Sequence, residues 1–207
     1  MIEAFNTRYL LPTKELRCLS VLLAIYENPA ISQKSIGKAT YLSSSMVNNY
    51  MKYFSDEGLV TISGDTNRTK SYHVTDAGYE ILTSSLLEYS AEIVQFYTSV
   101  KKEIIHILNG FYKEGIKNVA LYGAAETAEI VFAAATETGL AVTGIIDNDK
   151  EKYGKLFNGL TIKSPDEIGE IAFDAIIIAS FGKQEEIYQY IKTFTGGRVL
   201  IKRLSDL

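Results

Sequence analysis

The sequence predicts an α/β protein in which a small helical part with a two-stranded hairpin precedes a long helix and a parallel sheet. Three observations support this fold class. Residues 1–80 hold three short helical patterns and then two short strand patterns. Residues 81–115 have the periodicity of one long helix. From 116 to 207, short apolar runs alternate with helical patterns, which is typical of a parallel sheet with helical crossovers.

The composition excludes several classes of protein. With 46% hydrophobic and 22% charged residues, the 207-residue chain has the composition of a soluble globular protein. Its net charge of −4 argues against indiscriminate attraction to nucleic acid. No run approaches the roughly 20 apolar residues that span a bilayer, and the N-terminus lacks a secretory signal pattern. Cys18 is the single cysteine and the two histidines are scattered, so we expect a cytoplasmic protein without a membrane partner or a metal.

The first part of the chain has the layout of a winged helix-turn-helix. The stretch "TKELRCLSVLLAIYENP" predicts an amphipathic helix, and "ISQKSIGKATYLS" a second helix with Ser32 as its N-cap. The stretch "SSSMVNNYMKYFSDEG" predicts a third helix, capped by Ser43 or Ser44 and stopped by Gly58. The runs "LVTIS" and "KSYHV", separated by the polar turn "GDTNRT", predict a hairpin.

This part also resembles the MarR-type winged-helix transcription regulators over roughly residues 12–85. The resemblance rests on "LSSSMVNNYMKYFSDEGLV" and "YHVTDAG", and it includes Leu42, Ser45, Val47, Phe54, Gly58, Val60, Thr75, Asp76 and Gly78. It implies a winged-helix DNA-binding domain over residues 1–80. It also implies a dimer whose third helix enters the major groove of double-stranded DNA while the wing touches the backbone.

Polar side chains on the third helix and the hairpin are the candidates for DNA contact. If Val47, Tyr50 and Phe54 face the core, the outer face carries short hydroxyl, amide and basic groups that reach phosphates and base edges. The candidate residues are Ser44, Ser45, Asn48, Asn49, Lys52, Arg68 and Lys70. Two alternatives stay open: the polar groups only solvate an exposed helix, or the wing serves association between proteins. Few of the candidates are basic, so one copy should bind weakly.

The middle of the chain, residues 81–115, predicts a connector and dimerisation helix. Its apolar stripe comprises Leu82, Leu86, Leu87, Ile93, Val94, Tyr97, Val100, Ile104 and Leu108. A helix of about 30 residues is about 45 Å long, so its apolar face needs another surface. We expect the same helix of a second subunit or the α/β domain to cover it, and therefore predict a homodimer.

The last part, residues 116–207, predicts a Rossmann-like sheet domain that senses a ligand. An apolar strand ends at Gly123, a helix follows, and a second strand ends at Asp147. Gly123, Ala125 and Ala128 stand at the positions of a G-x-G-x-x-G/A turn, where helix amides would bind phosphate and Asp147 a ribose hydroxyl. The methyl of Ala125 stands where backbone should approach pyrophosphate, so a Rossmann-like fold without a ligand is the alternative.

Residues 117–181 resemble the N-terminal nucleotide-binding domain of sugar-nucleotide dehydratases and sugar acyltransferases of polysaccharide synthesis. The resemblance rests on the run from "VALYGAAETAEIVFAAATETG" through "IIDND" to "FDAIIIAS". It implies a pocket for a nucleotide or sugar nucleotide, with Gly123, Asp147, Asn148 and Ser180 in its lining. Together with the glycine turn, the candidate cofactor-binding residues are Gly123, Ala124, Ala125, Glu126, Thr127, Asp147, Asn148 and Ser180.

The order of the two domains resembles the architecture of the Rex-type redox repressors, which sense NADH. The sequence therefore predicts a transcription regulator that binds duplex DNA as a dimer and senses NAD(H) or a sugar nucleotide. One alternative is a sugar-nucleotide or NAD-dependent enzyme, or an accessory subunit in polysaccharide synthesis. We do not expect an enzyme, because no Ser/His/Asp set follows the first Rossmann half. A second alternative is an assembly module that binds neither DNA nor nucleotide.

Overall fold

The computed structural model describes residues 11–64 and 69–206, which form two compact units, Met1–Val94 and Gln95–Leu207. Helix α4 (Asp76–Lys113) contributes residues to both units. The sequence predicted this helix over 81–115, within a three-part division of the chain. No helix among the described residues is long and apolar enough to cross a membrane.

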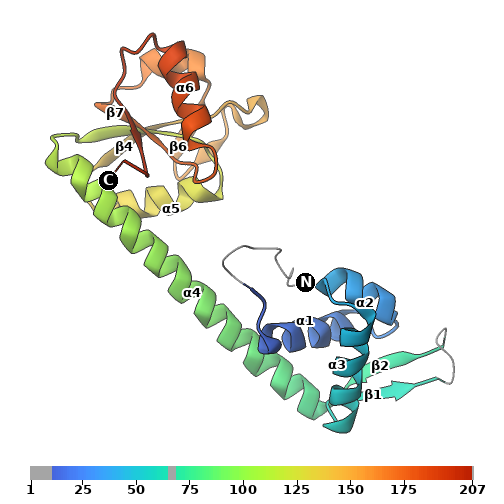
Figure 1. Ribbon diagram of the computed structural model, residues 1–207. Coiled ribbons are helices and arrows are strands. Elements are labelled where there is room, and N and C mark those ends of the chain that lie inside the picture. Colours follow the sequence, from blue (N-terminus) through green and yellow to red (C-terminus); the bar gives the residue numbers. More distant parts are fainter. Residues whose placement is uncertain (1–10, 65–68, 207) are drawn as a thin grey trace. The chain divides into compact units, whose positions relative to one another are not determined.

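The N-terminal unit contains three helices and a hairpin in the predicted order (Figure 1). The helices are α1 (Lys14–Glu27), α2 (Gln33–Thr40) and α3 (Ser44–Asp56). Each begins with a hydroxyl cap that accepts a hydrogen bond from a backbone N–H three residues on, at 3.1–3.3 Å; the caps are Thr13, Ser32 and Ser43. The three helices and the hairpin share one apolar core, formed by Leu19, Val21, Leu22, Ile25, Ile36, Val47, Met51, Phe54, Val60, Tyr72 and Leu82.

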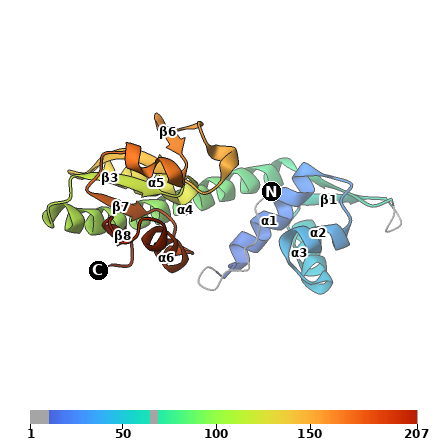
Figure 2. The same ribbon diagram turned by 90° about the horizontal axis from the view of Figure 1, so that it is seen from above.

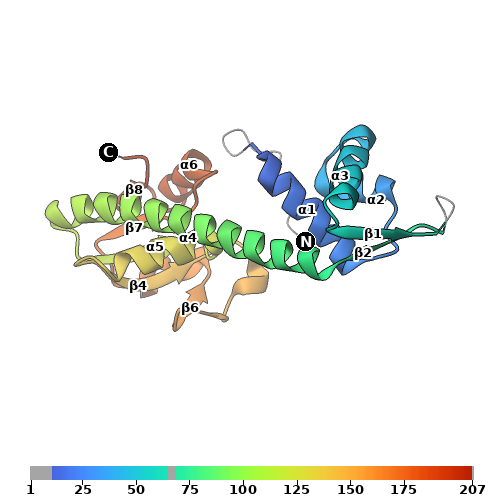
Figure 3. The same ribbon diagram turned by 90° about the horizontal axis from the view of Figure 1, so that it is seen from below.

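The hairpin consists of β1 (Val60–Ser63) and β2 (Ser71–Val74), paired antiparallel, and it projects from the helices (Figure 3). The chain then turns into α4 at the predicted "TDAG" motif. The Thr75 hydroxyl donates to the carbonyl of Gly58 and accepts from the N–H of Gly78. A Cβ at position 78 would lie 2.1 Å from the carbonyl oxygen of Leu59, so only glycine fits this approach.

Helix α4 is anchored at its two ends and exposed between them. Leu82 belongs to the core of the N-terminal unit, whereas Ile104, Leu108 and Phe111 belong to the core of the C-terminal unit. The intervening stretch has exposed apolar side chains, namely Leu86, Leu87, Ile93, Val94, Phe96 and Tyr97. Much of the stripe that the sequence predicted to need a partner surface is therefore uncovered in a single chain.

The C-terminal unit is built on a six-stranded mixed sheet in the order β5-β6-β4-β3-β7-β8. The strands are β3 (Asn118–Tyr122), β4 (Ala141–Ile146), β5 (Leu156–Phe157), β6 (Leu160–Lys163), β7 (Ala175–Ile178) and β8 (Ile201–Arg203). Five are parallel, as the alternating pattern predicted, and β5 runs antiparallel to β6. The strand order places the ends of β4 and β7 on either side of the end of β3.

Helices cover both faces of this sheet (Figure 2). Helix α5 (Glu126–Ala135) and the last turns of α4 pack on one face, against Val119, Leu121, Ile145 and Ile177 among others. Helix α6 (Gln184–Phe194) packs on the other face, where Ile191 contacts the cluster of Ala120, Tyr122, Ile146, Ile176 and Ile178. Short 3₁₀ turns at Lys150–Lys152 and Pro165–Glu170 complete the connections.

Candidate functional sites

The outer face of α3 presents the side chains that the sequence assigned to DNA contact. All five candidates on this helix are exposed: Ser44, Ser45, Asn48, Asn49 and Lys52. The opposite face is buried through Val47, Met51 and Phe54. Among the described residues, the side chains of Asn48, Asn49 and Lys52 form no hydrogen bond or ion pair, and Ser45 bonds only the cap hydroxyl of Ser43. The fold therefore leaves this polar surface available to a partner.

A second basic surface lies between α2 and β2. Lys70, a predicted contact, lines a groove of about 480 Å³ together with Lys34 in the first turn of α2. The free amides and positive dipole end of α2 face the same region, and both favour an anion such as a phosphate. The predicted contact Arg68 lies outside the described residues. Lys34 was missed by the sequence reasoning, although its place two residues after the cap Ser32 would have located it at a helix start.

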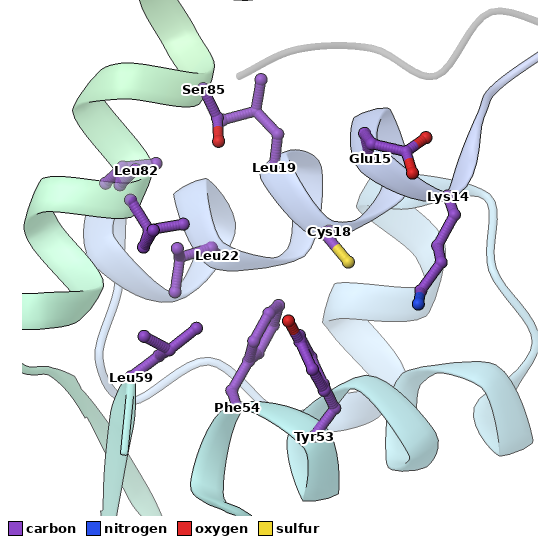
Figure 4. Close-up of a pocket in the computed structure, with 11 residues that line it drawn as sticks. Lys14, Glu15, Cys18, Leu19, Leu22, Tyr53, Phe54, Leu59, Leu82 and Ser85 are labelled. Carbon is purple, nitrogen blue, oxygen red and sulfur yellow. The ribbon is translucent and has the colours of Figure 1, made fainter. Parts of the chain in front are cut away.

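A small apolar cavity of about 200 Å³ lies between α1, α3 and the start of α4 (Figure 4). Tyr53 and Phe54 rise from α3 toward Cys18 on α1, and Lys14 lies at the side of the same space. Burial raises the pKa of the Cys18 thiol, so this thiol stays protonated at neutral pH and is a poor nucleophile. The sequence did not predict this cavity.

In the C-terminal unit, the predicted glycine turn follows β3. Gly123 has a φ of +107°, a backbone conformation that glycine adopts readily, and its N–H donates to the carbonyl of Ile146 at 2.7 Å. Ala125 is the N-cap of α5 and supplies no side-chain cap, so the first amides of this helix receive no side-chain partner. Glu126 is exposed and Thr127 is half-buried in the first helical turn.

Asp147, the predicted ribose acceptor, is only 9% exposed and already accepts three hydrogen bonds. One carboxylate oxygen accepts from the N–H of Ala124 at 2.7 Å and from Lys152 Nζ at 3.0 Å, and the other accepts from the N–H of Asp149 at 2.9 Å. Burial alone would raise the pKa of Asp147, but the two amides and the Lys152 ammonium outweigh burial and lower it. The carboxylate thus ties the glycine turn to the loop after β4.

The other predicted ligand residues lie at the same edge of the sheet. Asn148 Oδ1 accepts a hydrogen bond of 2.6 Å from the hydroxyl of Tyr122, and the hydroxyl of Tyr153 donates to the Asn148 carbonyl at 3.3 Å. Burial raises the pKa of the Tyr122 hydroxyl, which stays protonated and donates. Ser180 follows β7, which pairs with β3. The ends of β3, β4 and β7 therefore bring the turn at 123–125, Asp147 and Ser180 to one edge.

Comparisons with known proteins support the N-terminal unit most clearly. Residues 16–91 match the family model of the winged helix-turn-helix, which agrees with the helices and hairpin described above. Residues 115–196 match a model described as C2185-like, N-terminal. No curated protein matches the chain.

Among similar solved structures is MepR of Staphylococcus aureus, a transcription regulator of the multidrug efflux pump MepA, with 20% identity, 40% of this chain and 62% of MepR covered, and a TM-score of 0.35. BpsR of Bordetella bronchiseptica, whose DNA binding is regulated by 6-hydroxynicotinic acid, is 22% identical. The match covers 38% of this chain and 57% of BpsR, with a TM-score of 0.33. A MarR-family regulator from a Rhodococcus species is 16% identical, and the match covers 47% of this chain and 72% of that regulator, with a TM-score of 0.38. The match spans less than two thirds of the length of MepR and of BpsR.

Proposed function

We propose that this protein is a transcription regulator that binds double-stranded DNA through α3 and the hairpin. The observation that carries the proposal is the outer face of α3, whose amide, hydroxyl and basic groups are exposed and largely unused by the fold. In a winged helix-turn-helix, such a helix fits the major groove, where Asn pairs with adenine and hydroxyls reach phosphates. Lys34 and Lys70 would hold the backbone on the side of the hairpin.

Selection from fragmented genomic DNA tests this proposal. The purified protein should enrich a small set of fragments at low salt, and fluorescence anisotropy should give tighter binding to those fragments than to shuffled duplexes. Replacing both Lys34 and Lys70 by Gln should weaken binding to all duplexes alike, because phosphate contacts carry no sequence information. A selection that enriches no fragment would favour the alternative of an assembly module.

The regulator is proposed to act as a homodimer joined through α4. The exposed apolar side chains of the stretch 86–97 support this, because a continuous apolar face on one helix is unfavourable in water. Leu87 is 72% exposed and Val94 is 62% exposed in the single chain. A dimer would also double the number of phosphate contacts, which offsets the weak binding expected of one copy.

Analytical ultracentrifugation tests the dimer directly. The wild type should sediment at twice the 23.0 kDa chain mass at micromolar concentration. Leu87→Glu should shift the protein toward the monomer, since it places a charge within the apolar face. Gln95→Glu adds the same charge at an exposed polar position of α4 and should leave the dimer intact. A wild-type monomer would contradict this part of the proposal.

The C-terminal unit is proposed to sense a nucleotide-type ligand, either NAD(H) or a sugar nucleotide, and so to shift the dimer between states of different DNA affinity. Support comes from the glycine turn, the uncapped start of α5 and the convergence of three strand ends. Asp147 already accepts three hydrogen bonds, so we do not assign it the main contact with the ligand. The ligand phosphate would instead bind the amides at the start of α5, with Lys152 nearby. Calorimetry with NAD, NADH, NADP and UDP- and dTDP-sugars tests the proposal, and an absence of heat across the panel would contradict it.

A further inference from the structure

A groove of about 420 Å³ lies beside α3, on the side that faces α1. We call it the α1–α3 groove; its lining residues are Lys14, Arg17, Met46, Asn49, Tyr50 and Tyr53. Its polar lining comprises two cations, an amide and two phenol groups, all of which can donate hydrogen bonds. None of the six lining residues is acidic and two are cations, so the lining favours an anion over a cation.

One donor of Arg17, a lining residue of this groove, has no partner. The Nε atom of Arg17 is fully buried, and it forms no hydrogen bond within the described part of the chain. A buried donor without an acceptor is costly, and native proteins leave few of them. The neighbouring Lys14 ammonium lies 5.8 Å from the centre of the Tyr53 ring, which keeps this charge beside the groove. Arg17 and Lys14 thus lie beside the same groove, and neither side chain forms a hydrogen bond or ion pair within the described part of the chain.

Glu15, the acidic neighbour of both cations in sequence, lines two other cavities and not this groove, although the charges of Lys14 and Arg17 act on its carboxylate. The guanidinium plane of Arg17 suits an anion with two or more acceptor oxygens, because it donates several N–H groups in a fixed fork. The amide of Asn49 and the hydroxyls of Tyr50 and Tyr53 add donors that a tetrahedral oxyanion can use.

We propose that the α1–α3 groove is a phosphate-binding site in which Arg17 is the principal ligand and Lys14 the second cation. Asn49 lies both in the groove and on the face of α3 predicted to contact DNA. A phosphate bound here therefore lies next to the bases that α3 would read. Two sources have this chemistry: a backbone phosphate of the bound duplex, which rests on the proposed function, and a free phosphorylated small molecule that would compete with the duplex.

The first arm of the test measures DNA binding as a function of salt. Log affinity falls linearly with log salt concentration, with a slope of about −0.9 for each phosphate neutralised. If the groove holds a backbone phosphate, Arg17→Gln should flatten the slope by about 0.9 per subunit bound, and Arg17→Lys should restore much of it. Lys155→Gln removes one exposed charge from the C-terminal unit and should leave the slope unchanged.

The second arm titrates the full-length protein with inorganic phosphate, followed by NMR, against chloride at equal ionic strength. If the groove accepts a free phosphate, the wild type should show saturable shifts at residues of α1 and α3, and Arg17→Gln should abolish them. This arm needs no DNA, so it shows whether the α1–α3 groove binds phosphate even if the protein fails to bind any duplex. In that case only the proposed function fails.

The two arms together distinguish the sources. A flatter slope without saturable phosphate binding assigns the site to the DNA backbone, and saturable binding without a slope change assigns it to a free phosphate. An unchanged slope together with no saturable binding overturns the proposal. Thermal unfolding must show that Arg17→Gln is folded; otherwise Lys14→Gln, at an exposed position, takes its place with the same expected directions.

Discussion

The two units use their polar side chains in opposite ways. On α3 of the N-terminal unit, Asn48, Asn49 and Lys52 are exposed and form no side-chain bonds within the described residues. At the sheet edge of the C-terminal unit, Asp147 is buried and accepts three hydrogen bonds from Ala124, Asp149 and Lys152. Both sets were candidates for ligand contact on sequence grounds. Their surroundings indicate that the first is available for binding, whereas the second maintains the fold.

This contrast shows that a residue type at a motif position does not determine its role. The acid after the second strand of a nucleotide-binding unit binds a ribose hydroxyl when its oxygens are free. Here the same carboxylate fixes the glycine turn itself. Its importance for a ligand is then indirect, through the conformation of Gly123 and Ala124.

The largest effect is expected from a negative charge on α3. Ser45→Glu places a carboxylate on the exposed face that would meet DNA phosphates, and such like-charge contacts cost several kcal/mol. We expect duplex affinity to fall by roughly a hundredfold, or about 3 kcal/mol, in anisotropy titrations. Ser84→Glu, at an exposed serine of α4, is the matched control and should change affinity little. Equal losses in the two variants would remove the distinction drawn for α3.

Asp147→Ala should mainly destabilise the C-terminal unit. It leaves the N–H of Ala124, the N–H of Asp149 and the Lys152 ammonium without their acceptor, which we expect to cost about 2–3 kcal/mol. Thermal unfolding followed by circular dichroism measures this loss. If Asp147→Ala keeps the wild-type unfolding temperature and only weakens a ligand, Asp147 is a ligand-binding residue and not a structural one.

The same residue predicts a pH dependence. The pKa of Asp147 in the folded state lies below its ordinary value of 3.8, which applies to the unfolded state. The charged carboxylate therefore stabilises the fold at pH values above the unfolded pKa. This contribution is lost as pH falls through the lowered folded pKa. The stability difference between wild type and Asp147→Asn should therefore be constant near neutral pH and shrink below about pH 4. A difference that grows on acidification would contradict the assignment.

Removing the Lys152 ammonium should lower the stability less than removing the Asp147 carboxylate does. Lys152→Met breaks the 3.0 Å ion pair but leaves both amide bonds to Asp147, so we expect a loss of about 1 kcal/mol in unfolding free energy. It should also raise the pKa of Asp147 toward its ordinary value, which NMR titration of the carboxyl carbon detects. Lys150→Met, at an exposed position in the same 3₁₀ turn, is the control and should do neither.

Ala125→Gly should have the smallest effect on stability. Glycine is tolerated at an N-cap, and Ala125 provides no side-chain bond, so a change of a few tenths of a kcal/mol is expected. The Ala125→Gly variant is informative when its nucleotide affinity is compared with that of the wild type by calorimetry. If the methyl crowds a pyrophosphate, glycine tightens binding. If the edge binds another kind of ligand or none, the wild type and the variant behave alike.

Much of the fold was accessible from the sequence because it depends on local chemistry. The hydroxyl caps Ser32 and Ser43 predicted the starts of α2 and α3, and Gly58 predicted the end of α3 to within two residues. The short strand β5 was not predicted, since two residues carry no periodicity. Helix α4 begins at Asp76 rather than 81, because the Thr75 hydroxyl accepts from the N–H of Gly78 and so caps the first turn.

The candidate sites divide in the same way. The exposed face of α3 follows from the 3.6-residue period and was predicted residue by residue. The bonds of Asp147 were not predicted, because they depend on how closely the β3 turn approaches the end of β4. The two grooves were not predicted either, because residues far apart in the chain line them. Lys34 and Lys70 line one groove, and Arg17 and Asn49 line the other.

The central claim, that α3 reads DNA with side chains the fold does not need, is tested most directly by sequence discrimination. Anisotropy titrations would compare the wild type and the double variant Asn48→Ala/Asn49→Ala on a selected duplex and on its shuffled counterpart. Each Asn–adenine pair contributes about 1–3 kcal/mol of discrimination, so the affinity ratio between the duplexes should fall at least tenfold while the unfolding temperature stays unchanged. An unchanged ratio, or a variant that unfolds at a much lower temperature, would contradict the account.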